Sequence, residues 1–149
     1  MNFHFKIILL ISISFFFITR SSSQIPPFRI ALTDSTYYNS KNLPKNIPLM
    51  IIYFSATCKH CKEFTGKLIN HIKDFQKFRI MMISNEPLDQ IKNFENNFHL
   101  RRFSNIVVGT ESYTLVVHRY YSISTLPYVA LFNSNGRLIH YDTSSILNK

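Results

Sequence analysis

The length, composition and charge of this chain narrow the classes of protein to which it can belong. Its 149 residues fit one domain, 46% of them are hydrophobic and can fill a core, and 3 Gly and 6 Pro are too few for a fibrous or low-complexity chain. The formal net charge of +9 comes from scattered Lys and Arg residues with no basic run among aromatic residues, so we expect no nucleic-acid partner.

The first residues carry the pattern of a targeting segment. A positively charged start is followed by the apolar run Ile7–Ile18 and by small residues at Ser21–Ser23. This order is typical of a secretory signal peptide cleaved before Gln24, and an uncleaved N-terminal membrane anchor is the alternative. We therefore divide the chain into residues 1–23, the signal peptide or anchor, and residues 24–149, one domain that lies outside the cytoplasm.

In the first half of the domain, apolar runs precede an amphipathic segment. Phe28–Leu32 predicts a short strand, and the polar segment Thr33–Asn46 follows it. Leu49–Phe54 is a continuous apolar run with β-branched and aromatic members, which predicts a strand buried on both faces. From Cys61 onward apolar residues recur every three or four positions, which predicts an amphipathic helix. The apolar face of this helix consists of Phe64, Leu68, Ile72 and Phe75.

The second half continues the alternation of strands and helices. Phe78–Ser84 predicts a second buried strand, Pro87 suits the first turn of a second helix, and Ser104–Val108 predicts a third strand. Ser112–Tyr121 is expected to hold one or two helical turns. The final segments, Tyr128–Phe132 and Arg137–Tyr141, flank the turn sequence Asn133–Gly136 and predict a β-hairpin. This order of elements indicates an α/β sandwich with a mixed sheet.

The two cysteines lie where the buried strand gives way to the first helix. Cys58 and Cys61 are three positions apart, and a bridge that closes so small a loop constrains the unfolded chain little. The arrangement makes better sense as a redox pair. A zinc site would need four ligands, and only His60 and His71 lie near in the sequence. A static disulfide is the other alternative. We expect no metal and no other cofactor.

The position of Cys58 favours its thiolate form. The residue stands at the start of a helix, where unpaired N–H groups and the positive end of the helix dipole stabilise an anion. Lys59 and protonated His60 add positive charge and tune the redox potential of the pair. We therefore predict that Cys58 is the nucleophile that forms a mixed disulfide with a partner. Cys61, deeper in the helix, would be the resolving thiol.

These residues and their order resemble the thioredoxin superfamily, and most of all its exported, TlpA-like thiol–disulfide oxidoreductases. Tyr53–Cys61 is similar to the active-site strand and turn of that family, and Ser124–Tyr128 is similar to its cis-proline loop. The resemblance covers about residues 28–142. It implies a thioredoxin-like sandwich in which helices flank a central mixed β-sheet. The sequence departs from the family at its end, where the C-terminal helix is reduced to Ser144–Asn148 or absent.

The resemblance also implies further site residues. A cis bond before Pro127 would place the backbone of Leu126 beside the cysteines, and Pro127 would guard the pair against metal capture. A trans proline that merely begins a strand is the alternative. Thr57 stands where the family usually carries Trp. By the same resemblance we expect Thr57 and Leu126 to line the substrate groove. The acidic residue that assists proton transfer in thioredoxin would fall near Ile52, which is apolar.

The function that follows from the resemblance is an enzyme, a protein-disulfide reductase or oxidase. It would exchange disulfides with cysteines of other exported proteins in the periplasm or cell envelope, supplied by an unidentified redox partner. Residues 7–18 would attach it to the membrane if they are not removed. The alternative is a binding or assembly module with the same fold and little turnover, because the chain lacks both the Trp and the acid near position 52.

Overall fold

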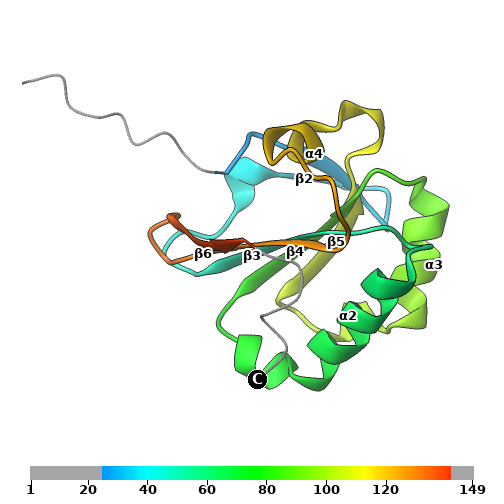
Figure 1. Ribbon diagram of the computed structural model, residues 1–149, viewed down its shortest axis with the longest axis horizontal. Helices are drawn as coiled ribbons and strands as arrows, with labels where there is room; N and C mark the ends of the chain where they lie inside the picture. Colours follow the sequence, from blue (N-terminus) through cyan, green and yellow to red (C-terminus); the bar gives the residue numbers. More distant parts are fainter. Residues whose placement is uncertain (1–24, 142–149) are drawn as a thin grey trace, which may run out of the picture.

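The computed structural model describes residues 25–141, in which one sheet separates two layers of helices (Figure 1). The predicted signal peptide or anchor and the predicted residual helix at Ser144–Asn148 lie outside the described residues. None of the helices in the described part has both the length and the apolar content that crossing a membrane requires. The division of the chain into residues 1–23 and 24–149 stays a prediction.

The sheet is mixed, as the sequence pattern predicts. Its strands are β1 (Arg29–Leu32), β2 (Tyr37–Asn39), β3 (Leu49–Tyr53), β4 (Arg79–Ser84), β5 (Ile106–Thr110), β6 (Tyr128–Phe132) and β7 (Leu138–Tyr141). They lie side by side in the order β2-β1-β5-β4-β3-β6-β7. The three central strands, β5, β4 and β3, run parallel, and every other neighbouring pair is antiparallel.

One strand, β2, is absent from the sequence prediction. It lies inside the polar segment Thr33–Asn46, has only three residues, and pairs with β1 alone at the edge of the sheet. Tyr37 and Asn39 are exposed there. A short edge strand buries no continuous apolar face, so it leaves no hydrophobic pattern in the sequence.

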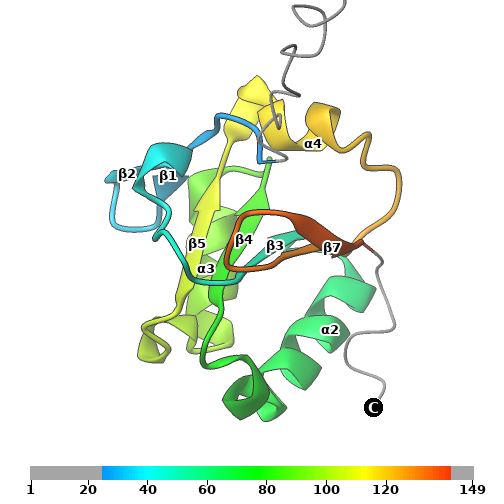
Figure 2. The ribbon, with the colours of Figure 1, turned by 90° about the vertical axis from the view of Figure 1, so that its left-hand side faces the viewer.

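The helices cover the two faces of the sheet unequally. In the described part, α2 (Lys59–Asn70) and α3 (Leu88–Asn97) lie on one face, and the short α4 (Val116–Tyr120) lies on the other (Figures 1 and 2). Single 3-10 turns occur at Ser40–Asn42, Ile72–Phe75, Leu100–Arg102 and Ser112–Thr114. The first helix is shorter than its apolar pattern predicts, because His71 leaves helical geometry with φ −107° and ψ 17°. Ile72 and Phe75 still pack against the core from their own turn.

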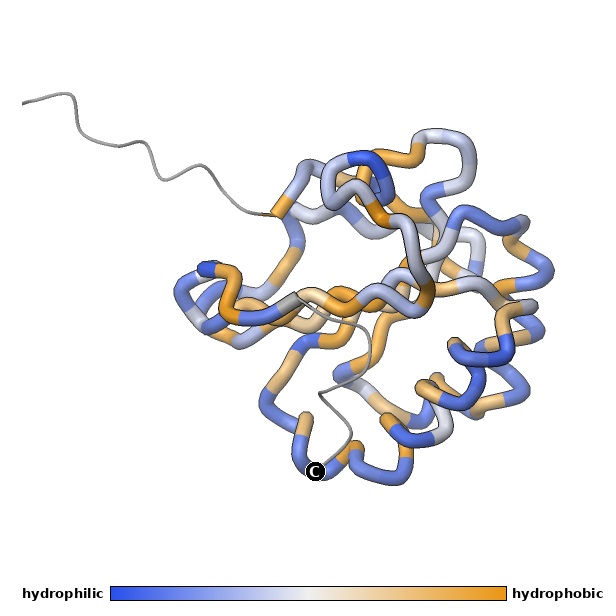
Figure 3. Tube along the Cα trace, in the orientation of Figure 1, coloured by the Kyte–Doolittle hydropathy of each residue, from blue (hydrophilic) through white to orange (hydrophobic). Residues whose placement is uncertain are grey.

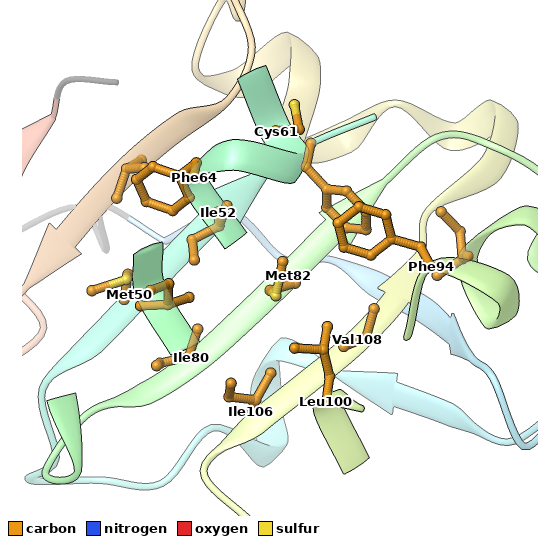
Figure 4. Packing of buried hydrophobic residues seen from close by; sticks show 14 residues of the cluster. Met50, Ile52, Cys61, Phe64, Ile80, Met82, Phe94, Leu100, Ile106 and Val108 are labelled. Atoms are coloured by element: carbon orange, nitrogen blue, oxygen red, sulfur yellow. The ribbon is translucent and has the colours of Figure 1, made fainter. Parts of the chain in front are cut away.

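Strand β3 is buried on both faces, as its continuous apolar run predicts. Met50 and Ile52 belong to the cluster between the sheet and the helices α2 and α3, which also contains Met82 (Figure 4). Ile51 and Tyr53 belong to the cluster on the opposite, α4 side. The hydropathy trace shows the same contrast: the central strands are mostly apolar, whereas α2 and α3 alternate between apolar and polar residues (Figure 3).

The predicted hairpin is confirmed. Asn133 N–H donates to Arg137 O at 2.9 Å, and the Asn133 side-chain oxygen accepts from Asn135 N–H and Arg137 N–H, each at 3.0 Å. Gly136 takes φ +73°, a left-handed conformation that glycine adopts without strain. The turn brings β7 back along β6 at the outer edge of the sheet.

Candidate active site

The register of the sheet brings three loops to one edge. Tyr53, the last residue of β3, pairs with Ile83 of β4 and with Tyr128, the first residue of β6. The loops that follow β3 and β4 therefore meet the loop that precedes β6. In open sheets with parallel strands, the carboxyl ends of those strands are where ligands and reacting groups gather. Cys58 and Pro127 lie on these loops, and Cys61 lies in the first turn of α2, which follows the β3 loop.

Cys58 stands at the boundary between the β3 loop and the helix. Its backbone is extended, with φ −70° and ψ 124°, and it forms the N-cap of α2. Its Sγ accepts a hydrogen bond from Cys61 N–H at 3.4 Å, which satisfies one of the free amide groups at the start of the helix. The side chain is half-buried, so a partner can reach the sulfur. This is the position that the sequence predicts for the nucleophile.

Cys61 lies one turn further and is fully buried. Its Sγ accepts from Ser55 N–H at 3.5 Å, and both cysteines are free thiols. Burial above all, together with the hydrogen bond to the Cys58 thiol and the charge of Glu86, raises the pKa of Cys61 to about 12, although the Ser55 N–H opposes the shift. Cys61 is therefore a neutral thiol at neutral pH.

The two residues between the cysteines are exposed to solvent. Lys59 Nζ lies 3.8 Å from one carboxylate oxygen of Glu63, and His60 Nδ1 lies 3.6 Å from the other. Glu63 is thus placed to offset the positive charge of Lys59 and to accept a hydrogen bond from His60 when that ring nitrogen carries a proton. Ion pairs between exposed side chains contribute little to stability. The role of Lys59 and His60 in tuning the redox potential of the cysteines stays a prediction.

The proline loop has the geometry that the family resemblance predicts. The Leu126–Pro127 peptide bond is cis, so the trans alternative is wrong. Pro127 is buried. Leu126 is half-buried and packs against the same apolar cluster that contains Cys61, as Cys58 does. Thr57, directly before Cys58, is exposed. Thr57 and Leu126 therefore lie on the two loops that border the cysteines.

The structure adds a residue that the sequence analysis missed, Glu86. Its carboxylate accepts from Ser55 Oγ at 2.7 Å and from Ala56 N–H at 2.5 Å, and it lies 3.4 Å from Thr57 Oγ1. Ser84 Oγ, from the end of β4, also lies 3.4 Å from the carboxylate. One half-buried side chain thus holds the whole segment that leads from β3 into Cys58.

Ile52, which stands near the place of the thioredoxin acid, is fully buried in the apolar cluster. Glu86 brings a carboxylate to the segment before Cys58 from the loop that follows β4, and its charge acts on Cys61. Its signal in the sequence was its place two residues after a predicted buried strand, Phe78–Ser84, whose carboxyl end lies beside that of β3. That neighbourhood is a property of the sheet, and the sequence analysis did not use it.

Metal binding finds no support in the described residues. Within residues 25–141, no group of three or more His, Cys, Asp or Glu side chains could hold a metal ion. His71 lies near Cys58 in sequence, but its Nδ1 contacts Lys67 O at 3.0 Å at the far end of α2.

The fold and the cysteine pair ahead of α2 define the chain as a thioredoxin-like α/β protein. The chain belongs to the thioredoxin-like family, since the sequence profile of that family matches residues 46–138. The predicted superfamily and the predicted fold class are therefore confirmed. No curated protein sequence matches the chain.

Solved structures share this fold at low sequence identity. A secreted disulfide oxidoreductase of Mycobacterium tuberculosis, homologous to E. coli DsbE, is 12% identical with a TM-score of 0.66, covering 80% of this chain and 85% of its own. A thiol-disulfide oxidoreductase from Bacteroides fragilis is 17% identical with a TM-score of 0.68, covering 83% and 92%. A thioredoxin-like protein from Aeropyrum pernix is 10% identical with a TM-score of 0.61, covering 81% and 83%.

Proposed function

We propose that this chain is a thiol–disulfide oxidoreductase that acts through Cys58 and Cys61. One observation carries the proposal: a reachable cysteine caps the start of α2 while a second, buried cysteine lies one turn behind it. Helix N-H groups and the helix dipole stabilise a thiolate at the first position. The fold shared with disulfide oxidoreductases supports the same chemistry.

In the reducing direction, the Cys58 thiolate attacks one sulfur of a partner's disulfide. The partner's S–S bond breaks, one of its sulfurs leaves as a thiolate that takes up a proton, and the other stays bound to Cys58. Cys61 then loses its proton and attacks the Cys58 sulfur. The mixed disulfide breaks, the second partner thiol leaves, and a Cys58–Cys61 disulfide forms. Two electrons have passed to the partner, and the reverse sequence oxidises a partner dithiol.

The buried thiol suits the second step. The raised pKa of Cys61 keeps it protonated while Cys58 reacts, so the two thiols do not compete for the same disulfide. The Ser55 N–H stands ready to stabilise the Cys61 thiolate once it forms. Pro127 and the backbone of Leu126 lie on the loop that precedes β6. We assign both, together with Thr57, to the surface that contacts the substrate.

The substrates we propose are cysteine-containing exported proteins, with a separate redox partner that resets the pair. The support is the signal-like segment at residues 7–18 and the small residues after it. We accordingly place the protein in the periplasm or cell envelope, free or attached through its N-terminus. The measurement that checks this is the size and cellular fraction of the native protein, because removal of residues 1–23 shortens it.

The proposal is tested by disulfide exchange with dithiothreitol as the electron source. The purified chain should reduce a small aromatic disulfide. Cys58→Ser should lower the rate at least a hundredfold, because the remaining thiol, Cys61, is buried. Cys61→Ser should instead accumulate a mixed disulfide, visible by mass. Equal rates for the wild type and Cys58→Ser would refute the function. The redox potential of the pair then decides between reductase and oxidase.

The second candidate is a binding or assembly module with little turnover. The exposed Thr57, in the place where the family usually has Trp, and the apolar Ile52 favour it. A Cys58→Ser/Cys61→Ser double variant separates the two candidates, since an assembly module keeps its biological function without the cysteines.

A further inference from the structure

A groove opens beside Thr57, the residue that precedes the proposed nucleophile. It has a volume of about 430 Å³ and lies between the start of α2 and the length of α3. Thr57 and Lys62 line it from the α2 side. Cys58, the proposed nucleophile, follows Thr57 directly in the chain.

The α3 wall of the groove is built from carboxamides. Gln90, Asn93 and Asn97 all line it and all are exposed. Their spacing of three and four residues places them in one row along the helix. At 1.5 Å per residue the row extends roughly 10 Å, which is about the length of three residues in an extended chain.

The groove also has an aromatic floor. Phe94 and Phe98 line it, with ring centroids 4.8 Å apart, and Phe94 packs against Phe54 of the β3 loop at 4.6 Å. Phe94 is buried and belongs to the core cluster that contains Cys61. Phe94 is therefore fixed by the packing of the domain, and it gives the row of carboxamides an apolar neighbour in the groove.

We propose that this groove holds an extended segment of the substrate polypeptide, next to the cysteine that is attacked, and binds it through its main chain. The proposal rests on the proposed function. A carboxamide both donates and accepts hydrogen bonds, and each residue of an extended chain offers one main-chain donor and one acceptor. Gln90, Asn93 and Asn97 can thus bind successive peptide groups whatever the side chains are.

The charge of the groove adds one preference. Among the described residues that line the groove, Lys62 is the one with a charged side chain. An acidic side chain in the bound segment would lie near this ammonium group. The substrate class is therefore an unfolded or exposed extended segment around a disulfide, sequence-tolerant and without excess positive charge.

The test compares a peptide disulfide with a small disulfide. The first is a short peptide of alanine and serine joined to a copy of itself through one cysteine. The second is a small aromatic disulfide, which has no peptide groups for the row of carboxamides to bind. In the full chain, Gln90→Ala/Asn93→Ala/Asn97→Ala should raise KM for the peptide about tenfold with kcat unchanged, because hydrogen bonds to the peptide are lost. The rate with the small disulfide should not change.

Asn96→Ala is the matched control, since Asn96 is an exposed residue of α3 that does not line the groove. It should leave both substrates unaffected. A peptide whose main-chain nitrogens are methylated beside the cysteine should have the same raised KM with the wild type as the ordinary peptide has with the triple variant.

An unchanged peptide KM in the triple variant, with the small disulfide still reduced, would overturn the groove and leave the proposed function standing. A methylated peptide that reacts as well as the ordinary one would overturn recognition of the main chain. If the wild type reduces neither disulfide, the proposed function itself fails, and the groove fails with it.

Discussion

Two carboxylates at the same edge of the sheet have opposite uses. Glu111 directly follows β5, and Glu86 lies two residues after β4, the neighbouring parallel strand. Glu111 is 2% exposed and accepts from Tyr53 OH at 2.7 Å, Val117 N–H at 2.8 Å and His118 N–H at 3.2 Å. Its partners belong to β3 and α4, so Glu111 joins the sheet to the helix on that face.

Glu86 makes the same kinds of bond to different partners. It is half-buried, and its donors, Ser55 and Ala56, belong to the segment that leads into Cys58. The comparison teaches that the identity of an acidic residue and its place after a strand do not define its role. The element that supplies its hydrogen-bond donors does. Glu111 supports the architecture, and Glu86 positions the site.

The largest effect is expected at Glu111. Glu111→Ala leaves the Tyr53 hydroxyl and two amide groups at the start of α4 without their acceptor, and the free energy of unfolding should fall by about 3 kcal/mol. Urea unfolding measures it. Glu63→Ala is the control, because its partners are exposed ion pairs, and it should change stability by less than about 1 kcal/mol. Equal losses in the two variants would remove the structural role of Glu111.

At Glu86 we expect substitution to change the reaction rate more than the free energy of unfolding. Glu86→Ala removes the acceptor that holds Ser55, Ala56 and Thr57, and mixed-disulfide formation should slow about tenfold. Glu86→Gln keeps an acceptor oxygen and should recover most of the rate.

A second measurement separates charge from position at Glu86. Because the negative charge of Glu86 contributes to the raised pKa of Cys61, Glu86→Gln should lower that pKa, which thiolate absorbance or alkylation rates report. The Cys58–Cys61 pair should then become more oxidising, since its reduced form is stabilised. An unchanged Cys61 pKa in Glu86→Gln, with Glu86→Ala as fast as the wild type, would leave Glu86 without a role in the site.

The last prediction concerns alkaline pH. Each of the two carboxylates contributes to the raised pKa of one neighbour, Glu111 to that of Tyr53 and Glu86 to that of Cys61. Burial first, and then the bond to Glu111, raises the pKa of Tyr53 above its usual value, while Cys61 reaches about 12. A group whose folded-state pKa is raised stabilises the fold below its unfolded pKa and loses that contribution as the pH rises. The reduced protein should therefore lose stability from about pH 9 towards pH 12.

Cys61→Ser removes the contribution of the Cys61 thiol to this pH dependence and keeps the contribution of Tyr53. Its free energy of unfolding should fall less steeply with pH than that of the wild type over the same interval, as measured by urea unfolding at each pH. Parallel curves for the two proteins would show that Cys61 titrates alike in the folded and unfolded states.

The sequence by itself determined the local elements and the spacing of the two cysteines. The apolar run of β3, the helical period that begins at Cys61 and the turn sequence Asn133–Gly136 each depend on neighbours within a few residues, so their physics is readable from the chain. The same holds for Cys58 and Cys61, because one helical turn sets their separation. The cis bond before Pro127 followed from the family resemblance, and it is present.

Only the tertiary structure decided which side chains meet at the site. Glu86 reaches Ser55 across 31 positions, and the carboxamides of α3 face Thr57 across at least 33, because β3 and β4 lie side by side in parallel register. The short edge strand β2 depends in the same way on its pairing with β1. Local periodicity shows which face of an element is buried. It carries no information on which elements become neighbours, and that choice is made by the packing of the whole sheet.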